Sequence, residues 1–375
     1  MAIILAGLLV RFTLVVIDTY FFQLPGGEYD AFSFNRVAVE FSNHLHQGKP
    51  YEDFDYKFGW IYSIFIGYVY YFFGASNFLG SCLSCLAWLI SALTLRTIMI
   101  KLDYKKKYIF IALFIYTFLF PTSIIFTSLM LREAYLLLFS NLLFLSIVYT
   151  YNAKNISLKI LSLILLVFVS TLLSFFHRAG IIFTLSLSIF LIVFLSYRFW
   201  RKIDNLFFYV TIFFVLFLFH YFGILERIFD AITSYQSGHF EVSEHNRALY
   251  YQPHEVILRE YSIFNFVKVL IENFIYYFTK PTFLSASNIK DIPAIFENNL
   301  RIFAIIFLIY KLFFDFKNKN LFIILFAMFF LSEFVYSQAT VNWGTATRHH
   351  LPSLGFLVLL FFFPKVKEVK SNTRN

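Results

Sequence analysis

Charged residues are scarce in this chain. Asp, Glu, Lys and Arg make up 14% of its 375 residues, whereas a soluble domain carries about a quarter. Hydrophobic residues make up 59%, which is too apolar a composition for a surface in contact with water. The composition excludes a soluble enzyme and predicts an all-α, polytopic integral membrane protein, with Phe and Tyr at lipid-facing and interfacial positions.

Cysteine and nucleotide-binding motifs are also lacking. The only cysteines, Cys82 and Cys85, exclude a disulfide framework or a Cys-rich metal site, and packing inside an apolar run is their expected role. No Walker loop, G-x-S-x-G or G-x-G-x-x-G occurs. The histidines lack the i, i+4 spacing of a zinc site. We therefore expect no metal and no cofactor. An internal repeat is also missing, which argues against an inverted-repeat transporter.

Ten apolar runs predict about ten membrane spans within a single membrane domain, residues 1–375. The predicted spans are 2–22, 78–100, 108–128, 134–151, 159–176, 180–197, 205–222, 296–314, 321–337 and 351–364. With the N-terminus inside, the inner loops carry sixteen Lys and Arg but four acidic residues, which agrees with the positive-inside rule and places both termini in the cytoplasm.

The net charge of +9 is explained by this distribution, so no nucleic-acid partner is expected. Counting 59–73 as a further span would place the Lys-rich loop that follows the next span on the outer side, against the positive-inside rule. We therefore expect this segment to be a juxtamembrane helix that lies against the outer face. The two long outer loops are then 23–77 and 223–295, and the active face is extracytoplasmic.

An acidic turn follows the first predicted span. Asp30 and Glu28 stand in a turn that begins with two glycines, where a carboxylate can reach back over the membrane surface. Such a group can act as a general base or hold a cation. The alternative is a loop acid that only contacts solvent.

Basic residues mark the outer ends of three later spans: Arg132, the pair His177 and Arg178, and the pair Arg348 and His349. Ionisable groups beside membrane-depth sequence are costly and are functional candidates. Several of them around one outer cavity would bind phosphate or pyrophosphate. The alternative is that each arginine extends its charge to the lipid headgroups. The segment 223–295 combines aromatic, histidine and acidic residues, which are suited to binding sugar rings. The alternative is an ordinary outer loop.

The first outer loop resembles that of the integral-membrane glycosyltransferases of the GT-C superfamily. That pattern has an acid, a G-x-x-Y run, a surface-lying helix and an FG pair before the second span. The matching positions here are Asp30, 48–51, 59–73 and Phe73-Gly74.

The middle of the chain is similar to the EpsG/Wzy-type polysaccharide polymerases, in which one helix begins with R-x-x-(small) and a later one with F-H-x-(small). The corresponding segments are Arg132-Glu133-Ala134 and Phe176-His177-Arg178-Ala179-Gly180, and Gly344–His349 resembles an Arg motif before a late span. The family often has Gln or a small residue where Glu133 stands, so this resemblance assigns no role to Glu133.

The resemblance implies a bacterial inner-membrane enzyme that polymerises undecaprenyl-pyrophosphate-linked repeat units into O-antigen, capsule or exopolysaccharide. Asp30, with Glu28 second, would be the base. The three arginines would hold pyrophosphate, with His177 or His349 as donor. The implied partners are the undecaprenyl-linked sugar, membrane lipid, a chain-length regulator and a flippase of the same pathway. The alternatives are a transferase that uses a polyprenyl-monophosphate sugar, and a lipid-linked oligosaccharide flippase.

Overall fold

The computed structural model of this chain is helical in nearly all of the part that it describes, and an isolated bridge joins Phe316 and Lys365. The described residues are 1–25, 30–54, 61–153, 155–199, 220–221, 223, 225–230, 232–234, 260–286, 291–313, 316, 318–338, 340 and 342–365.

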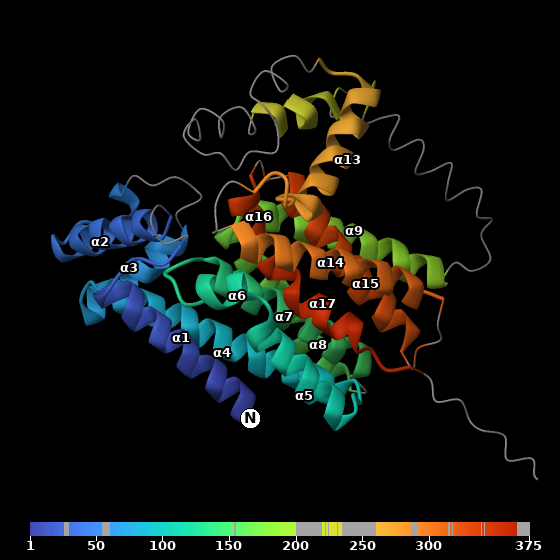
Figure 1. Cartoon of the computed structure of the whole chain (residues 1–375), viewed down its shortest axis with the longest axis horizontal. Coiled ribbons are helices and arrows are strands. Elements are labelled where there is room, and N and C mark those ends of the chain that lie inside the picture. The colour runs from blue at the N-terminus through green and yellow to red at the C-terminus, as the bar shows by residue number, and fades with distance from the viewer. Residues whose placement is uncertain are drawn as a thin grey trace, which may run out of the picture. The chain divides into compact units, whose positions relative to one another are not determined.

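The helices vary widely in length (Figure 1). Their bounds are α1 Ala2–Tyr20, α2 Phe32–His46, α3 Ile61–Phe73, α4 Asn77–Lys101, α5 Lys106–Phe114, α6 Pro121–Phe126, α7 Glu133–Asn152, α8 Ile156–Phe176, α9 Arg178–Phe199, α13 Ile263–Thr279, α14 Ile292–Lys311, α15 Lys319–Gln338, α16 Trp343–His349 and α17 Leu351–Phe361. A 3₁₀ turn lies at Tyr51–Asp53 and a π-helical turn at Ile115–Leu119, and residues 225–230 and 232–234 are also helical.

Six helices of the described part are long and apolar enough to cross a membrane: α1, α4, α7, α8, α14 and α15. They coincide with six of the predicted spans and are consistent with an all-α membrane protein. α9 and α17 match two more predicted spans as helices, but their apolar described stretches are shorter. Most of the predicted span 205–222 lies outside the described residues, so the count of ten and the orientation stay predictions.

The predicted span 108–128 is not one continuous helix. α5 passes into the π-helical turn, the chain becomes extended at Phe120, and Pro121 then begins α6. Proline has no N–H to continue the hydrogen-bond ladder, and its ring clashes with the preceding turn, so a helix starts at it more readily than it runs through it. The break occurs in a segment that stays apolar on both sides.

The chain divides into two compact units. The first contains residues 1–177, 301–329 and 351–375, and the second contains 178–300 and 330–350. In the first unit α7 is the most enclosed of the candidate spans and packs against α4, α8 and α17. Asn141 on α7 donates to Ser91 Oγ at 2.8 Å and to Tyr116 Oη at 3.3 Å. Gly355 of α17 lies so close to Asn141 that a β-carbon would overlap its Oδ1.

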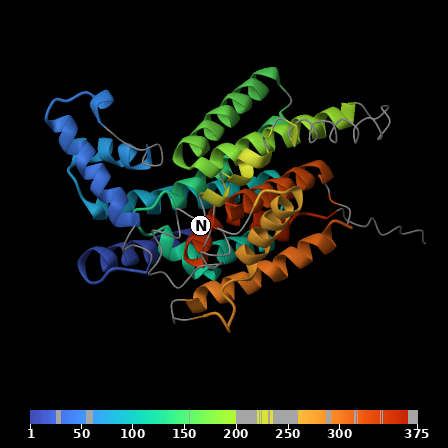
Figure 2. The ribbon, with the colours of Figure 1, turned by 90° about the horizontal axis from the view of Figure 1, so that it is seen from above.

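The predicted first outer loop contains two helices, α2 and α3, which lie side by side in the first unit (Figures 1 and 2). α3 confirms a helix over the described part of the predicted segment 59–73, although its position against the membrane surface stays a prediction. α2 was not expected. Gly67 of α3 allows the close approach, because a β-carbon there would meet the Phe41 ring and the Ala38 carbonyl of α2.

Arg11 of α1 is fully buried in the first unit. Its guanidinium lies 3.6 Å from the ring centroid of Trp88, and its Nε donates to Thr127 Oγ1 at 2.7 Å. A cation–π contact and a hydrogen bond to a hydroxyl stabilise a guanidinium that has left water. These contacts make Arg11 a packing residue that joins α1 to α4 and to the end of α6.

Candidate functional site

A set of aromatic rings brings four helices of the first unit together. We call it the aromatic cluster, and its members are Phe34 of α2, Tyr62 and Phe65 of α3, Tyr135 and Phe139 of α7 and Phe176 of α8. Ring centroids are 5.2 Å apart for Phe34 and Tyr62, 5.4 Å for Tyr62 and Tyr135, and 5.7 Å for Tyr135 and Phe176. Such separations are typical of aromatic pairs that stabilise one another.

Two of the sequence motifs meet at this cluster. The guanidinium carbon of Arg132 lies 5.5 Å from the ring centroid of Phe34, within cation–π range. His177 directly follows Phe176 at the end of α8 and is buried. The segments that carry Arg132 and His177 are therefore neighbours in the folded unit, as the predicted site required of them.

Asp30 stands shortly before a member of the aromatic cluster in the sequence. It begins a helical turn that leads into α2, and Phe34 stands four residues later. Residues four apart lie on the same face of a helix, so Asp30 is one turn from the ring that Arg132 contacts. Asp30 is half-buried. Glu28, the second candidate base, lies outside the described residues.

Glu133 is a buried acid at the start of α7, beside Arg132. It is 3% exposed, and its Oε2 is buried with no hydrogen-bond partner in the described part of the chain. The hydroxyl of Tyr135 is in the same condition. Burial raises the pKa of the Tyr62 hydroxyl well above its usual value, and the nearby Tyr135 and Glu133 raise it further, so Tyr62 keeps its proton at neutral pH.

Buried polar atoms without partners are uncommon in native structures and call for an explanation. Here they lie next to an arginine and among aromatic rings, which together form a suitable environment for a sugar or a phosphate. The sequence analysis assigned no role to Glu133, because the polymerases that the chain resembles often have Gln or a small residue at this position. Its position in an apolar run was the signal that could have identified it.

The remaining predicted residues belong to the second unit. Arg178 begins α9, and its side chain lies outside the described residues. Arg348 is half-buried in α16. The neighbouring His349 is buried with Nδ1 2.7 Å from Thr340 Oγ1. Because Arg132 is in the first unit, the prediction that the three guanidinium groups share one cavity stays a prediction.

The hydrogen-bond partners of His349 fix its tautomer. The Thr340 hydroxyl donates its single proton to the carbonyl of Tyr336 at 2.7 Å, so it can only accept from the ring. Nδ1 of His349 therefore carries a proton. This hydrogen bond holds the ring in place.

Glu333 and His350 form a buried pair in the second unit that the sequence analysis did not predict. Both are 1% exposed, and Glu333 Oε2 lies 2.6 Å from His350 Nδ1. His350 Nε2 lies 3.2 Å from the carbonyl of Tyr277, whose ring packs on the imidazole at 3.9 Å between centroids. A carbonyl only accepts, so Nε2 carries a proton, and a second proton lies between Nδ1 and the carboxyl group.

The pair is therefore neutral overall, either as imidazolium with carboxylate or as imidazole with carboxylic acid. Adding or removing a proton would leave a net charge on this buried pair, which is costly away from water. Glu333 could have been flagged, because it is an acid within the apolar run 321–337.

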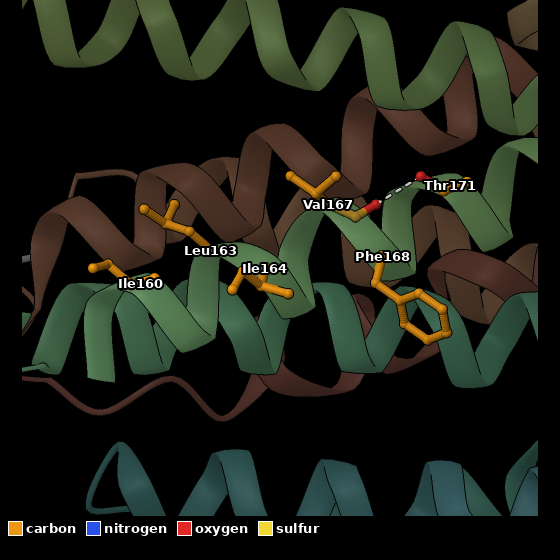
Figure 3. A pocket seen from close by; sticks show the side chains of 6 residues that line it. All are labelled: Ile160, Leu163, Ile164, Val167, Phe168 and Thr171. Carbon is orange, nitrogen blue, oxygen red and sulfur yellow. Dashed lines mark hydrogen bonds between the residues drawn. The ribbon is translucent and has the colours of Figure 1, made fainter. Parts of the chain in front are cut away.

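The apolar hollow on α8 does not suit a sugar or phosphate substrate. It measures about 540 Å³ and is lined by Ile160, Leu163, Ile164, Val167, Phe168 and Thr171 (Figure 3). The hydroxyl of Thr171 already donates to the carbonyl of Val167 at 2.9 Å. The other lining side chains are hydrocarbon. Such a surface fits a lipid chain. Among the described residues, no three His, Cys, Asp or Glu are grouped so that they could hold a metal ion.

The chain matches no family model, no curated protein and no solved structure. The class that the fold defines is an all-α membrane protein with several apolar helices long enough to span the bilayer. Any function must be argued from the arrangement of its residues.

Proposed function

We propose that this chain is an extracytoplasmic membrane glycosyltransferase of the Wzy type, which polymerises undecaprenyl-pyrophosphate-linked oligosaccharides at the bacterial inner membrane. The observation that carries the proposal is the aromatic cluster, which joins the Arg132–Glu133 segment to the Phe176–His177 segment. These are the two segments on which the resemblance to polysaccharide polymerases rests. Aromatic faces beside a guanidinium and a buried acid supply the groups that a lipid-linked sugar requires.

The reaction needs one base and one anion-binding group. The acceptor hydroxyl oxygen attacks the anomeric carbon, the bond from that carbon to the pyrophosphate oxygen breaks, and the hydroxyl proton passes to the base. Asp30 is the proposed base, with Glu28 second. Arg132 holds the developing charge on the leaving pyrophosphate, with Arg178 and Arg348 as further predicted ligands and His177 or His349 as donors. The leaving group is already activated, so no cofactor takes part.

The rival enzyme is a GT-C transferase that uses a polyprenyl-monophosphate sugar to modify a glycan or a protein. The two differ in the donor they consume. Membranes that contain the chain are supplied with either an undecaprenyl-pyrophosphate oligosaccharide or an undecaprenyl-monophosphate sugar. Consumption of the first alone supports the polymerase, and consumption of the second alone supports the rival.

A lipid-linked oligosaccharide flippase is the second candidate, and one observation favours it. Candidate spans bury charged side chains, with Glu297 and Arg301 on α14 and Glu333 on α15. Charges in spans are typical of pathways for polar substrates. The aromatic cluster, which brings Arg132 and the segment of His177 together, supports a single binding place more directly, so we rank the flippase second.

Deleting the gene and separating the surface polysaccharide on a gel distinguishes all three functions. Loss of the ladder with a single capped repeat unit left is expected for a polymerase. Loss of all surface polysaccharide would instead point to the flippase, and a full ladder of changed mobility to the modifying transferase. Reporter fusions test the orientation separately: Lys106 should report the cytoplasm and Pro50 the outer side.

A further inference from the structure

A second hollow, of about 840 Å³, lies in the first unit away from the aromatic cluster. It is lined at the ends of three helices, by residues that follow α4, by Lys311 at the end of α14 and by the residues around the end of α17. α4 and α14 are candidate membrane spans, and the end of a span is where the chain reaches the level of the lipid headgroups.

Three ammonium groups line this hollow: those of Lys105, Lys311 and Lys365. The acid that lines it is Asp103. Like charges gathered in one partly enclosed place repel each other unless an anion lies between them. Lys105 and Lys365 are exposed.

Lys311 forms the buried end of the hollow. It is 3% exposed, and its Nζ donates to the carbonyls of Leu360 at 3.0 Å and Phe361 at 2.7 Å. These carbonyls end α17, where the helix dipole favours a cation. An ammonium group has three N–H donors, and the third has no acceptor in the part of the chain that the structure describes. One buried donor is thus left over in a hollow rich in positive charge.

The walls of the hollow are apolar. Tyr108 and Phe362 stack with centroids 5.9 Å apart, and Phe307 and Phe361 pack at 4.8 Å. Tyr108 is 40% exposed. A soluble phosphate compound would gain nothing from these rings, whereas the upper part of an acyl chain would be buried against them. The combination of an ammonium-lined hollow and aromatic walls matches an amphiphile with an anionic head.

We propose that this hollow binds the phosphate of an anionic phospholipid, with the headgroup held by Lys311, Lys105 and Lys365 and the acyl chains against Tyr108 and Phe362. Basic hollows between helices at the cytoplasmic surface are suited to such headgroups. In the predicted orientation the lipid comes from the cytoplasmic leaflet, on the opposite side from the proposed transferase site. The proposal does not depend on the transferase function.

Native mass spectrometry of the detergent-purified full chain tests the proposal. The probes are dioleoylphosphatidylglycerol and, as the neutral lipid, dioleoylphosphatidylcholine. The test variant is the double substitution Lys105→Gln/Lys365→Gln, whose positions are exposed, so the fold is retained. The matched control is Lys101→Gln/Lys107→Gln, which removes two exposed charges of the same region that do not line the hollow.

The expected result is tight binding of phosphatidylglycerol over phosphatidylcholine, weakened about 30-fold in the test variant and little in the control. Equal binding in the test variant and the unchanged chain would overturn the proposal. So would an equal loss in the control variant, which would indicate general surface charge. A third arm adds soluble glycerol 1-phosphate: displacement of the lipid at equal concentration would mean a soluble phosphate ligand and would also overturn it.

Discussion

Removing one member of the Glu333–His350 pair should strongly destabilise the second unit. The two side chains are 1% exposed and 2.6 Å apart, so truncation of either leaves the other buried without its ionic partner. Removal of one partner from a buried pair costs about 3–5 kcal/mol. Glu333→Ala and His350→Ala should each lose that amount. The double variant should lose less than their sum, with a coupling energy of about 1–3 kcal/mol.

Glu333→Gln is the shape-matched variant. The amide N–H₂ can donate to His350 Nδ1 while Nε2 still donates to the carbonyl of Tyr277, so both ring nitrogens keep their hydrogen bonds. We expect this variant to stay within about 1 kcal/mol of the unchanged protein. The exposed acid Glu260 supplies the control, and Glu260→Ala should change stability by less than about 0.5 kcal/mol.

Unfolding in mixed micelles with increasing dodecyl sulfate, followed by circular dichroism, measures these differences. The reasoning predicts early unfolding for the two alanine variants and near-normal curves for Glu333→Gln and Glu260→Ala. If Glu333→Ala unfolds at the same detergent fraction as the unchanged protein, the pair is open to water and the account of a buried shared proton is wrong.

Three further outcomes are expected. Asp30→Asn should reduce chain growth about 10²–10⁴-fold in a polymerisation assay, with normal membrane insertion, because Asn cannot accept the proton; full activity would exclude Asp30 as base. Arg132→Lys should also lower activity strongly, because Lys has no bidentate fork for pyrophosphate, and unchanged donor consumption would contradict this. Gly355→Ala should cost about 1–3 kcal/mol in the unfolding assay, because the new methyl group overlaps Asn141. Gly344→Ala, whose β-carbon would be 3.4 Å from its nearest neighbour, should cost little, and equal losses would contradict the packing argument.

The long spans were predictable because each is a continuous apolar run of about the bilayer thickness. The break between α5 and α6 was missed, since hydropathy stays high across Pro121 and says nothing of the ladder that a proline interrupts. α2 was missed for the opposite reason. Its polar residues hide it from a hydropathy window, although the buried Phe34, Ala38 and Phe41 follow the helical period.

The candidate site was predictable only in part. Local motifs identified Arg132 and His177, and the structure makes their segments neighbours through the aromatic cluster. The pairing of Glu333 in α15 with His350, which follows α16, is a contact that no local pattern encodes. An acid within an apolar run gives the signal for Glu333 alone, and its partner follows only from the packing of the unit.

The capped end of α17 has a consequence for how the protein is made. α17 has 11 residues and is therefore about 16 Å long, roughly half the hydrocarbon thickness. Its last carbonyls accept from Lys311 and from the hydroxyl of Tyr104, which lies 2.8 Å from the Leu359 carbonyl. Both side chains are synthesised before α17, so these donors are already present when α17 leaves the ribosome. We therefore expect insertion of this short helix to follow assembly of the earlier helices.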